Sequence, residues 1–261
     1  MRLIYAVFIL LLVVMTSAQC QQTAEDWFNK GVALYGQGKY DDAVKAFDET
    51  TKLDPNLSDA WFNKGSALRH LDQYGEAIKA YDEVIRLDPN DAKAWSNKGI
   101  ALGSQGKYDD AIKCYDEAIR LDPNNTCAWF NKGNTLGDQS KYDDAIKCYD
   151  EAIRLDPNYP LAWNNKGIAL GSQGKYDDAI KCYDEAIRLD PNDAGAWNNK
   201  GVALSIQGKY ADAIKCFDEA IKINPNLAQA WYAKSIVLKA TGRTADADSA
   251  LAKAKELGYS G

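Results

Sequence analysis

One tryptophan recurs every 34 residues along most of the chain, and this period limits the fold more than any other feature. The tryptophans are Trp27, Trp61, Trp95, Trp129, Trp163, Trp197 and Trp231. Six of the seven prolines keep the same period, and asparagine follows each of the six. Such a period predicts an array of repeats that bury their apolar faces against their neighbours. We expect seven repeats, at residues 24–57, 58–91, 92–125, 126–159, 160–193, 194–227 and 228–261.

Each repeat is predicted to hold two helices joined by a turn, and the third repeat carries the clearest signals. Its stretch AWSNKGIALGSQG predicts a first helix that closes at Gly106, because glycine adopts positive φ at little cost. The stretch KYDDAIKCYDEAIRLDPN predicts a second helix, since its first turn holds aspartates that the helix dipole favours. That helix is expected to stop before Pro123, which disfavours helical geometry in the preceding residue.

The third repeat resembles a tetratricopeptide repeat. It fills the signature places of that family with Trp95, Gly99, Leu102, Tyr108, Ala111, Tyr115, Ala118 and Pro123. Comparable residues recur in the other repeats, and the repeat sequences are similar to those of prokaryotic members of the family, archaeal ones included. The resemblance implies an all-α fold, a right-handed superhelical α-solenoid of seven helix-turn-helix repeats. It also implies a concave groove, lined by the first helices, in which segments of partner proteins bind.

The N-terminal segment is unlike the repeats. Arg2 precedes thirteen apolar residues, and small residues at 16–18 suit an export peptidase. We interpret residues 1–18 as a cleavable signal peptide and 19–23 as a short linker, and we expect an exported protein, secreted or associated with the cell envelope. One alternative is an uncleaved membrane anchor, although a span needs about 20 apolar residues. Another is a lipid on Cys20. Contact with a membrane is expected only through this segment.

Cysteine spacing and net charge exclude two classes of chemistry. Four cysteines stand 34 residues apart, at Cys114, Cys148, Cys182 and Cys216. Equivalent points of stacked helices lie roughly 10 Å apart, beyond the reach of a disulfide. We therefore expect these cysteines to act as small buried apolar residues. The net charge of −6 argues against nucleic acid as a partner, since phosphate contact needs clustered lysine and arginine.

No arrangement of residues indicates an enzyme. The only histidine, His70, has no second histidine to complete a metal pair. Acidic residues are expected in helix starts and in ion pairs of the second helices, such as Asp109 with Lys113 and Glu117 with Arg120. Tyrosine follows the recurring Gly-Lys where a phosphate loop needs serine or threonine. We therefore expect a non-catalytic protein without catalytic, cofactor-binding or metal-binding residues.

The last repeat differs from the interior ones on one face of its second helix. Asp248 and Lys255 stand where the fifth repeat has Ile180 and Ile187. The isoleucines are expected to face the following repeat, so charges at these places predict a solvated cap. A capped array argues against end-to-end assembly, and we expect a monomer.

A helical wheel of the first helices separates a buried stripe from a face that points away from it. The stripe is expected to hold the tryptophan, the glycine four places later and the leucine seven places later. The places one, two and five after the tryptophan point toward the groove of the family. The groove candidates one place after it are Phe28, Phe62, Phe130, Asn164, Asn198 and Tyr232. Those two places after it are Asn29, Asn63, Asn97, Asn131, Asn165 and Asn199. Aliphatic residues stand five places after it, at Val32, Ile100, Ile168, Val202 and Ile236.

The repeated asparagine has two interpretations. Asparagine within a helix is about 0.6 kcal/mol less favourable than alanine, so six copies need an offsetting gain. A carboxamide can match the N–H and C=O of an extended peptide, and the resemblance implies such a ladder in some family members. The other interpretation is structural, with each asparagine bonded to a neighbouring helix of a recently duplicated repeat.

We predict a protein–protein interaction module that binds an extended or helical peptide segment in the groove. Its partner is an unspecified protein or peptide. The alternative is a structural or assembly scaffold of the cell envelope that acts through its outer surface. A glycan-binding or enzyme-accessory role draws on the groove aromatics, but it lacks an acid pair at a defined site.

Overall fold

The computed structural model describes residues 22–259, which are helical outside short turns. They divide into an N-terminal unit that ends at Gln105 and a C-terminal unit that begins at Gly106. The first helices of the repeats are α2 (Ala24–Gly36), α4 (Ser58–His70), α6 (Ala92–Ser104), α8 (Thr126–Asp138), α10 (Pro160–Ser172), α12 (Ala194–Ile206) and α14 (Ala228–Ala240). The second helices are α3 (Tyr40–Leu53), α5 (Tyr74–Leu87), α7 (Tyr108–Leu121), α9 (Tyr142–Leu155), α11 (Tyr176–Leu189), α13 (Tyr210–Ile223) and α15 (Thr244–Glu256). The prediction of an all-α fold of paired helices is confirmed.

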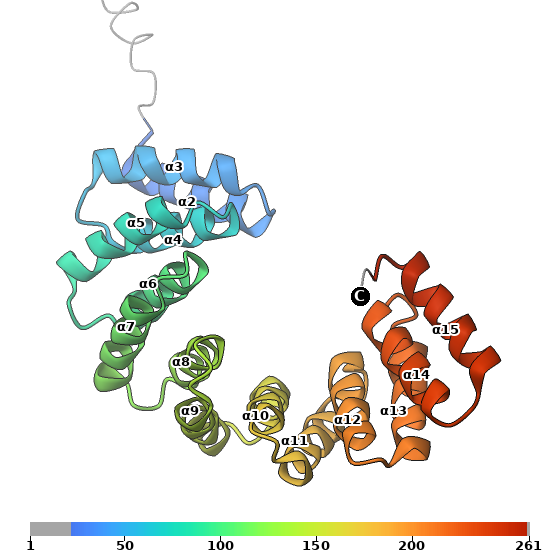
Figure 1. The fold of residues 1–261 in the computed structure, drawn as a ribbon. Helices are drawn as coiled ribbons and strands as arrows, with labels where there is room; N and C mark the ends of the chain where they lie inside the picture. Colours follow the sequence, from blue (N-terminus) through green and yellow to red (C-terminus); the bar gives the residue numbers. More distant parts are fainter. Residues whose placement is uncertain (1–21, 260–261) are drawn as a thin grey trace, which may run out of the picture. The chain divides into compact units, whose positions relative to one another are not determined.

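Helices that are neighbours in the chain pack antiparallel within each unit. In the N-terminal unit α2 packs on α3 and α4 on α5, and α3 and α5 also contact the first helix of the following repeat (Figure 1). The C-terminal unit repeats this arrangement from α7 to α15, and its first helices α8, α10, α12 and α14 also contact one another in sequence.

The turn inside each repeat depends on one residue with positive φ. Gly106 has φ of 73°, as predicted, and glycine takes the same conformation at four equivalent places. Two repeats lack this glycine, and there Asp72 and Ser140 adopt φ of 56° and 59°. A side chain in this left-handed region costs roughly 1 kcal/mol compared with glycine. Ser140 is therefore a place where the repeat tolerates local strain.

The turn between repeats is built by the Asp-Pro-Asn sequence. Oδ1 of Asp122 accepts a hydrogen bond from the backbone N–H of Asn124 at 3.1 Å, and the other inter-repeat turns have an equivalent bond, with Asn224 as the acceptor in the last one. The carbonyl of Pro123 in turn accepts the indole N–H of Trp129 at 3.2 Å. Each later tryptophan from Trp61 to Trp231 makes this bond, at 2.9 to 3.2 Å. The tryptophan thus fixes a first helix to the turn that precedes it.

The predicted buried stripe is correct for glycine and leucine and wrong for tryptophan. Gly167 is buried beneath the ring of Tyr183, and Leu170 is buried beside it. The tryptophans are only half-buried, because the indole N–H reaches the exposed turn. The wheel did not single out the alanine that precedes every tryptophan from Trp61 onward, and this alanine is fully buried at Ala60, Ala94, Ala128, Ala162, Ala196 and Ala230.

A lysine on each first helix from α4 onward joins its repeat to the preceding one on the flank of the stripe. Nζ of Lys166 lies 5.6 Å from the ring centre of Trp163 and 2.5 Å from a carboxylate oxygen of Asp150 in the preceding repeat. Equivalent lysine–aspartate bridges of 2.5 to 2.6 Å occur at Lys64, Lys98, Lys132, Lys200 and Lys234. The lysine side chain is only about one-fifth exposed, which combines cation–π attraction with a charge-assisted bond.

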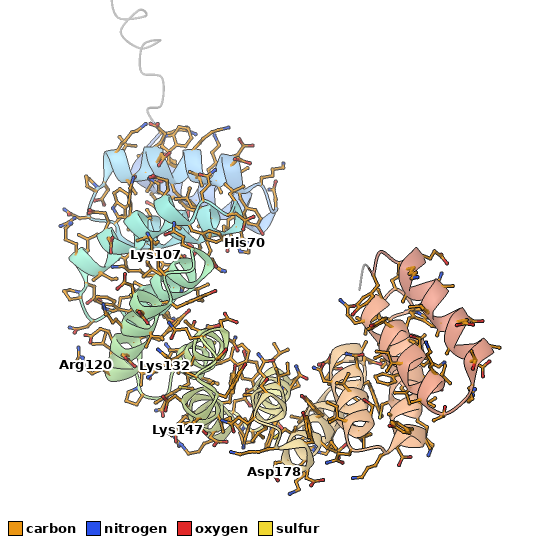
Figure 2. The ribbon with its side chains drawn as sticks, viewed as in Figure 1. His70, Lys107, Arg120, Lys132, Lys147 and Asp178 are labelled. Carbon is orange, nitrogen blue, oxygen red and sulfur yellow. The ribbon has the colours of Figure 1, made fainter. Side chains whose placement is uncertain are left out.

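Of the two ion pairs expected in α7, one changes in the structure and one is confirmed. Lys113 pairs with Asp110 at 2.9 Å and not with Asp109, because Oδ1 of Asp109 accepts a bond from Gln139 of the next repeat. The pair of Glu117 with Arg120 is confirmed. Figure 2 labels Arg120 on α7, Lys147 on α9 and Asp178 on α11, and each forms an ion pair within its own helix.

The expected contacts between repeats and the expected cap are present. Ile146 of α9 packs on the cluster of Leu170, Cys182 and Tyr183 in the next repeat. In α15, Asp248 and Lys255 are exposed. Cys114 and its equivalents are buried as predicted, and burial raises the pKa of Cys148, Cys182 and Cys216 to about 11.

The predicted signal peptide and Cys20 lie outside the described residues. Within residues 22–259, none of the helices has both the length and the apolar character that a membrane crossing requires.

Candidate functional site

The aromatic groove candidates have partners inside the molecule. Phe28 lies 6.1 Å from Phe47 and Phe62 lies 5.8 Å from Tyr81, measured between ring centres. In the C-terminal unit Phe130 contacts Tyr149 and Tyr159, and Tyr232 stacks on Tyr259. All four candidates are half-buried, and the three phenylalanines pack on the second helix of their own repeat, whereas Tyr232 packs on the residue Tyr259 beyond the end of α15.

The aliphatic residues five places after the tryptophan are the exposed apolar part of this face. Val32, Ile168, Val202 and Ile236 are 37 to 52 % exposed, and only Ile100 is half-buried. Such side chains gain free energy when a partner covers them, at about 25 cal/mol per Å².

The asparagines of the N-terminal unit bond mainly to their own helices. Nδ2 of Asn63 donates to the carbonyl of Asp59, and Nδ2 of Asn97 donates to the carbonyl of Lys93, both at 2.9 Å. Asn29 is exposed. This local bonding offsets part of the helix cost of asparagine without any ligand.

In the C-terminal unit the amides form a continuous chain across three first helices. The hydroxyl of Tyr149 and Nδ2 of Asn165 both donate to Oδ1 of Asn134, at 2.9 Å each. Nδ2 of Asn164 donates to Oδ1 of Asn165 at 3.2 Å, and Nδ2 of Asn199 donates to Oδ1 of Asn164 at 3.1 Å. We call these five residues the amide chain. It shows that some asparagines bond to neighbouring repeats, as the structural interpretation expects.

The amide chain still leaves polar groups for a ligand. Oδ1 of Asn134 already accepts two bonds, whereas no hydrogen bond to its Nδ2 is present in the described part of the chain. Asn165 and Asn199 each use one N–H of their amide groups, and a carboxamide has two. The side-chain oxygen of Asn198 is buried and, among the described residues, has no hydrogen-bond partner.

Two equivalent hollows lie between these first helices. The first, of about 310 Å³, is lined by Asn134, Gly137, Asp138, Tyr142, Tyr149, Asn165, Ile168, Ala169 and Ser172. The second, of about 240 Å³, is lined by Ile168, Gly171, Ser172, Tyr176, Tyr183, Asn199, Val202, Ala203 and Ile206. Ile168 and Ser172 belong to both, so the hollows are adjacent.

The hollows are nearly uncharged. Asp138 is the one ionisable acid or base, apart from tyrosines, among the residues that line them. Burial raises the pKa of Tyr149 and Tyr183 well above the ordinary tyrosine value, and the charge of Asp138 adds to the rise at Tyr149. These hydroxyls therefore stay protonated and can donate hydrogen bonds. Within residues 22–259 no group of three or more His, Cys, Asp or Glu side chains is placed to hold a metal ion.

The sequence predicted some residues of this surface but not those at the base of the hollows. Asn164, Asn165 and Asn199 were candidates, and they belong to the amide chain. Asn134 and the tyrosines were not. Asn134 stands five places after Trp129, where most repeats have an aliphatic residue, and Tyr149 occupies a signature core position of the second helix. Only the hydrogen bond between their side chains, from α9 to α8, connects them with the site. Asn131 and Asn198 are half-buried on the same helices. His70, at the end of α4 in Figure 2, is exposed and stacks on Tyr40.

Family models agree with the helix pairs. Models described as tetratricopeptide repeat match residues 28–92, 92–125, 114–147, 164–228 and 216–248, and one described as TPR repeat matches residues 133–174. The matched stretches together run from residue 28 to residue 248.

Solved structures show the same fold. The structure of a tetratricopeptide repeat protein from Parabacteroides merdae aligns with a TM-score of 0.73 and 17 % identity, over 92 % of this chain and 94 % of that one. MamA aligns with a TM-score of 0.57 and 26 % identity, over 61 % of this chain and 93 % of that one. YrrB, described as a TPR protein with an unusual peptide-binding site, aligns with a TM-score of 0.60 and 24 % identity, over 73 % and 98 %. No curated protein sequence matches this chain.

Proposed function

The chain belongs to the tetratricopeptide repeat family, and from that premise we propose that it binds a peptide segment of a partner protein on the face formed by α8, α10 and α12. Members of this family are generally protein–protein interaction modules and typically non-catalytic. Tetratricopeptide repeats therefore favour a protein partner over a small-molecule substrate.

The observation that carries the proposal is the combination of unused polar groups and exposed aliphatic side chains on one surface. The amide chain is rigid because its members bond one another, so the remaining amide N–H groups are held in place before a ligand arrives. Ile168 and Val202 supply apolar area beside them. A peptide backbone needs both kinds of contact at close spacing.

Selection from a random peptide library displayed on phage tests the proposal on the full chain. Each selected clone is retested against Ile168→Lys, which places a charge between the two hollows, and against Ile236→Lys. The second variant is a matched control, because Ile236 is exposed at the same helix place on α14 and lines neither hollow.

Clones that bind the unmodified chain and Ile236→Lys but not Ile168→Lys support the proposed surface. If the clones bind Ile168→Lys as tightly as the unmodified chain, the peptide site lies elsewhere. The double variant Asn165→Ala, Asn199→Ala separates the two interpretations of the asparagines. Unchanged peptide binding together with lower thermal stability would leave only the structural one, because the variant loses the inter-helix bonds of both residues.

We also propose that the protein is exported and acts in the cell envelope or outside the cell. The support is the apolar segment with small residues at its end, which resembles a cleavable signal. N-terminal sequencing of the mature chain tests this. A start at Gln19 is expected, and retention of Met1 contradicts cleavage.

A further inference from the structure

We propose that the two hollows bind a polyproline II segment that carries aliphatic side chains three residues apart. This inference rests on the proposed function and specifies the conformation and chemistry of the peptide. Three features support it: the spacing of the hollows, the hydrogen-bonding groups that they present, and their charge.

The spacing favours polyproline II over a β-strand. The two hollows are formed by consecutive first helices that contact one another, and packed helices lie about 8–10 Å apart. A β-strand places side chains on one face about every 6.6 Å. A polyproline II helix has three residues per turn and rises about 9.3 Å per turn. Its residues i and i+3 therefore point the same way at a separation that matches the distance expected between two packed helices.

The free amide groups of the first hollow are donors. Asn134 has both amide N–H groups unused by the described residues, since its oxygen takes the bonds of Tyr149 and Asn165. Asn165 keeps a second N–H. In the second hollow, no hydrogen bond joins the hydroxyl of Tyr183 to another described residue. Proline offers a carbonyl and no N–H, and a polyproline II backbone has no internal hydrogen bonds. Free amide donors suit this backbone, and the Asp138 carboxylate remains for a basic group.

The walls of the hollows are of the kind that proline-rich segments bind. Tyr142 and Tyr149 line the first hollow, and Tyr176 and Tyr183 line the second. Aromatic-lined grooves bind this preformed, low-entropy conformation in several unrelated domains. Ile168 separates the two hollows and contacts both positions of the segment.

Charge complementarity fixes one further property of the ligand. Asp138 is exposed at the first hollow, and the second hollow has no acid or base besides its tyrosines. In the described residues no ion pair involves Asp138. The segment is therefore neutral along its length, with one basic residue at the end that lies over the first hollow.

Fluorescence anisotropy with labelled peptides and the full chain tests the inference. The probe is Lys-Pro-Pro-Val-Pro-Pro-Val, with both ends blocked. Its control, Lys-Val-Pro-Val-Pro-Pro-Pro, has the same composition but places the valines two residues apart, on different faces of the helix. A second control, Lys-Ala-Ala-Val-Ala-Ala-Val, keeps the spacing and removes the polyproline II preference. We expect the probe to bind about ten-fold more tightly than the first control, which is the effect of losing one buried aliphatic contact. We also expect it to bind more tightly than the second control, because a flexible alanine peptide loses conformational entropy when it adopts polyproline II geometry.

Three variants locate the bound probe. Ile168→Lys is expected to abolish binding, Ile236→Lys to leave it unchanged, and Asp138→Asn to remove the contribution of the lysine. Equal binding of the probe and either control, or no binding of the probe, overturns the inference. The proposed function fails separately, if no displayed peptide depends on Ile168. Displayed peptides that depend on Ile168 but lack proline would retain the peptide site and reject polyproline II.

Discussion

Two glycines of one helix should respond in opposite ways to the same substitution. A Cβ on Gly167 of α10 would lie 2.5 Å from Cε1 of Tyr183 and 2.8 Å from Cδ1. Ordinary carbon contacts are about 3.5–4.0 Å. The ring of Tyr183 is only 4 % exposed, so it cannot move into solvent. A Cβ on Gly171, one turn later, would meet its nearest atom, the Tyr183 oxygen, at 3.7 Å.

The magnitudes follow from these distances. Overpacking of a core costs about 1–3 kcal/mol, and the short distance at Gly167 places it at the upper end. Alanine gains about 1 kcal/mol over glycine inside a helix. Gly167→Ala is therefore expected to destabilise the protein by about 2 kcal/mol. Gly171→Ala has the same gain in helix propensity without the clash, and it is expected to stabilise by up to about 1 kcal/mol.

Urea denaturation followed by circular dichroism measures both effects. Arrays of repeats do not always unfold in one step, so the comparison uses transition midpoints under identical conditions. The midpoint should fall for Gly167→Ala and rise for Gly171→Ala. In a double-mutant cycle, Tyr183→Ala should remove most of the cost of Gly167→Ala. A midpoint for Gly167→Ala at or above that of the unmodified chain would refute the packing explanation.

The remaining predictions concern the turn with positive φ, the lysine–aspartate bridge between repeats and the cysteine thiols. Ser140→Gly relieves the positive φ and should stabilise by about 1 kcal/mol, which a higher thermal midpoint would show. Lys166→Met removes the bridge to Asp150 and should destabilise by about 1 kcal/mol, less so at high salt, as denaturation in low and high salt can check. Cys127 is exposed, whereas burial raises the pKa of Cys148 to about 11, so a maleimide at neutral pH should label Cys127 before Cys148, as peptide mapping can show. Because the folded pKa of Cys148 exceeds the unfolded one, its contribution to stability is complete below about pH 9 and is lost as pH rises toward 11.

Local signals in the sequence predicted local structure correctly. Gly106 ends its turn with positive φ, and the second helices stop before proline. These features depend on the conformational limits of one or two residues, which are the same in any surroundings. The fixed period extended one such prediction to every repeat and thereby identified the paired helices.

The helical wheel could not predict how deeply each residue is buried, because burial also depends on the size of the side chain and on the neighbouring helices. The wheel ranks places by angle alone, and it placed Trp163 in the buried stripe. Alanine occupies the position where two helix backbones come closest, and an indole is too large to fit there. The Trp163 ring therefore lies at the border of the helix contact, where its N–H donates to the turn before α10. The alanine at Ala162 marks the place where backbones approach, and a single sequence gives no measure of that distance.

For the candidate site, too, the sequence determined one part and the tertiary structure another. Its candidate residues were chosen by the direction in which they point from the first helix. The repeat period and helix geometry determine that direction, so the sequence by itself selected Asn165 and Asn199. Which groups remain available to a ligand was decided only in the tertiary structure. Hydrogen bonds between Asn134, Tyr149 and the asparagines join residues from three repeats, and such contacts depend on how the helices pack. The 34-residue period thus determined which residues share one face of the first helices, and the packing of one repeat on the next determined which polar groups on that face stay unbonded.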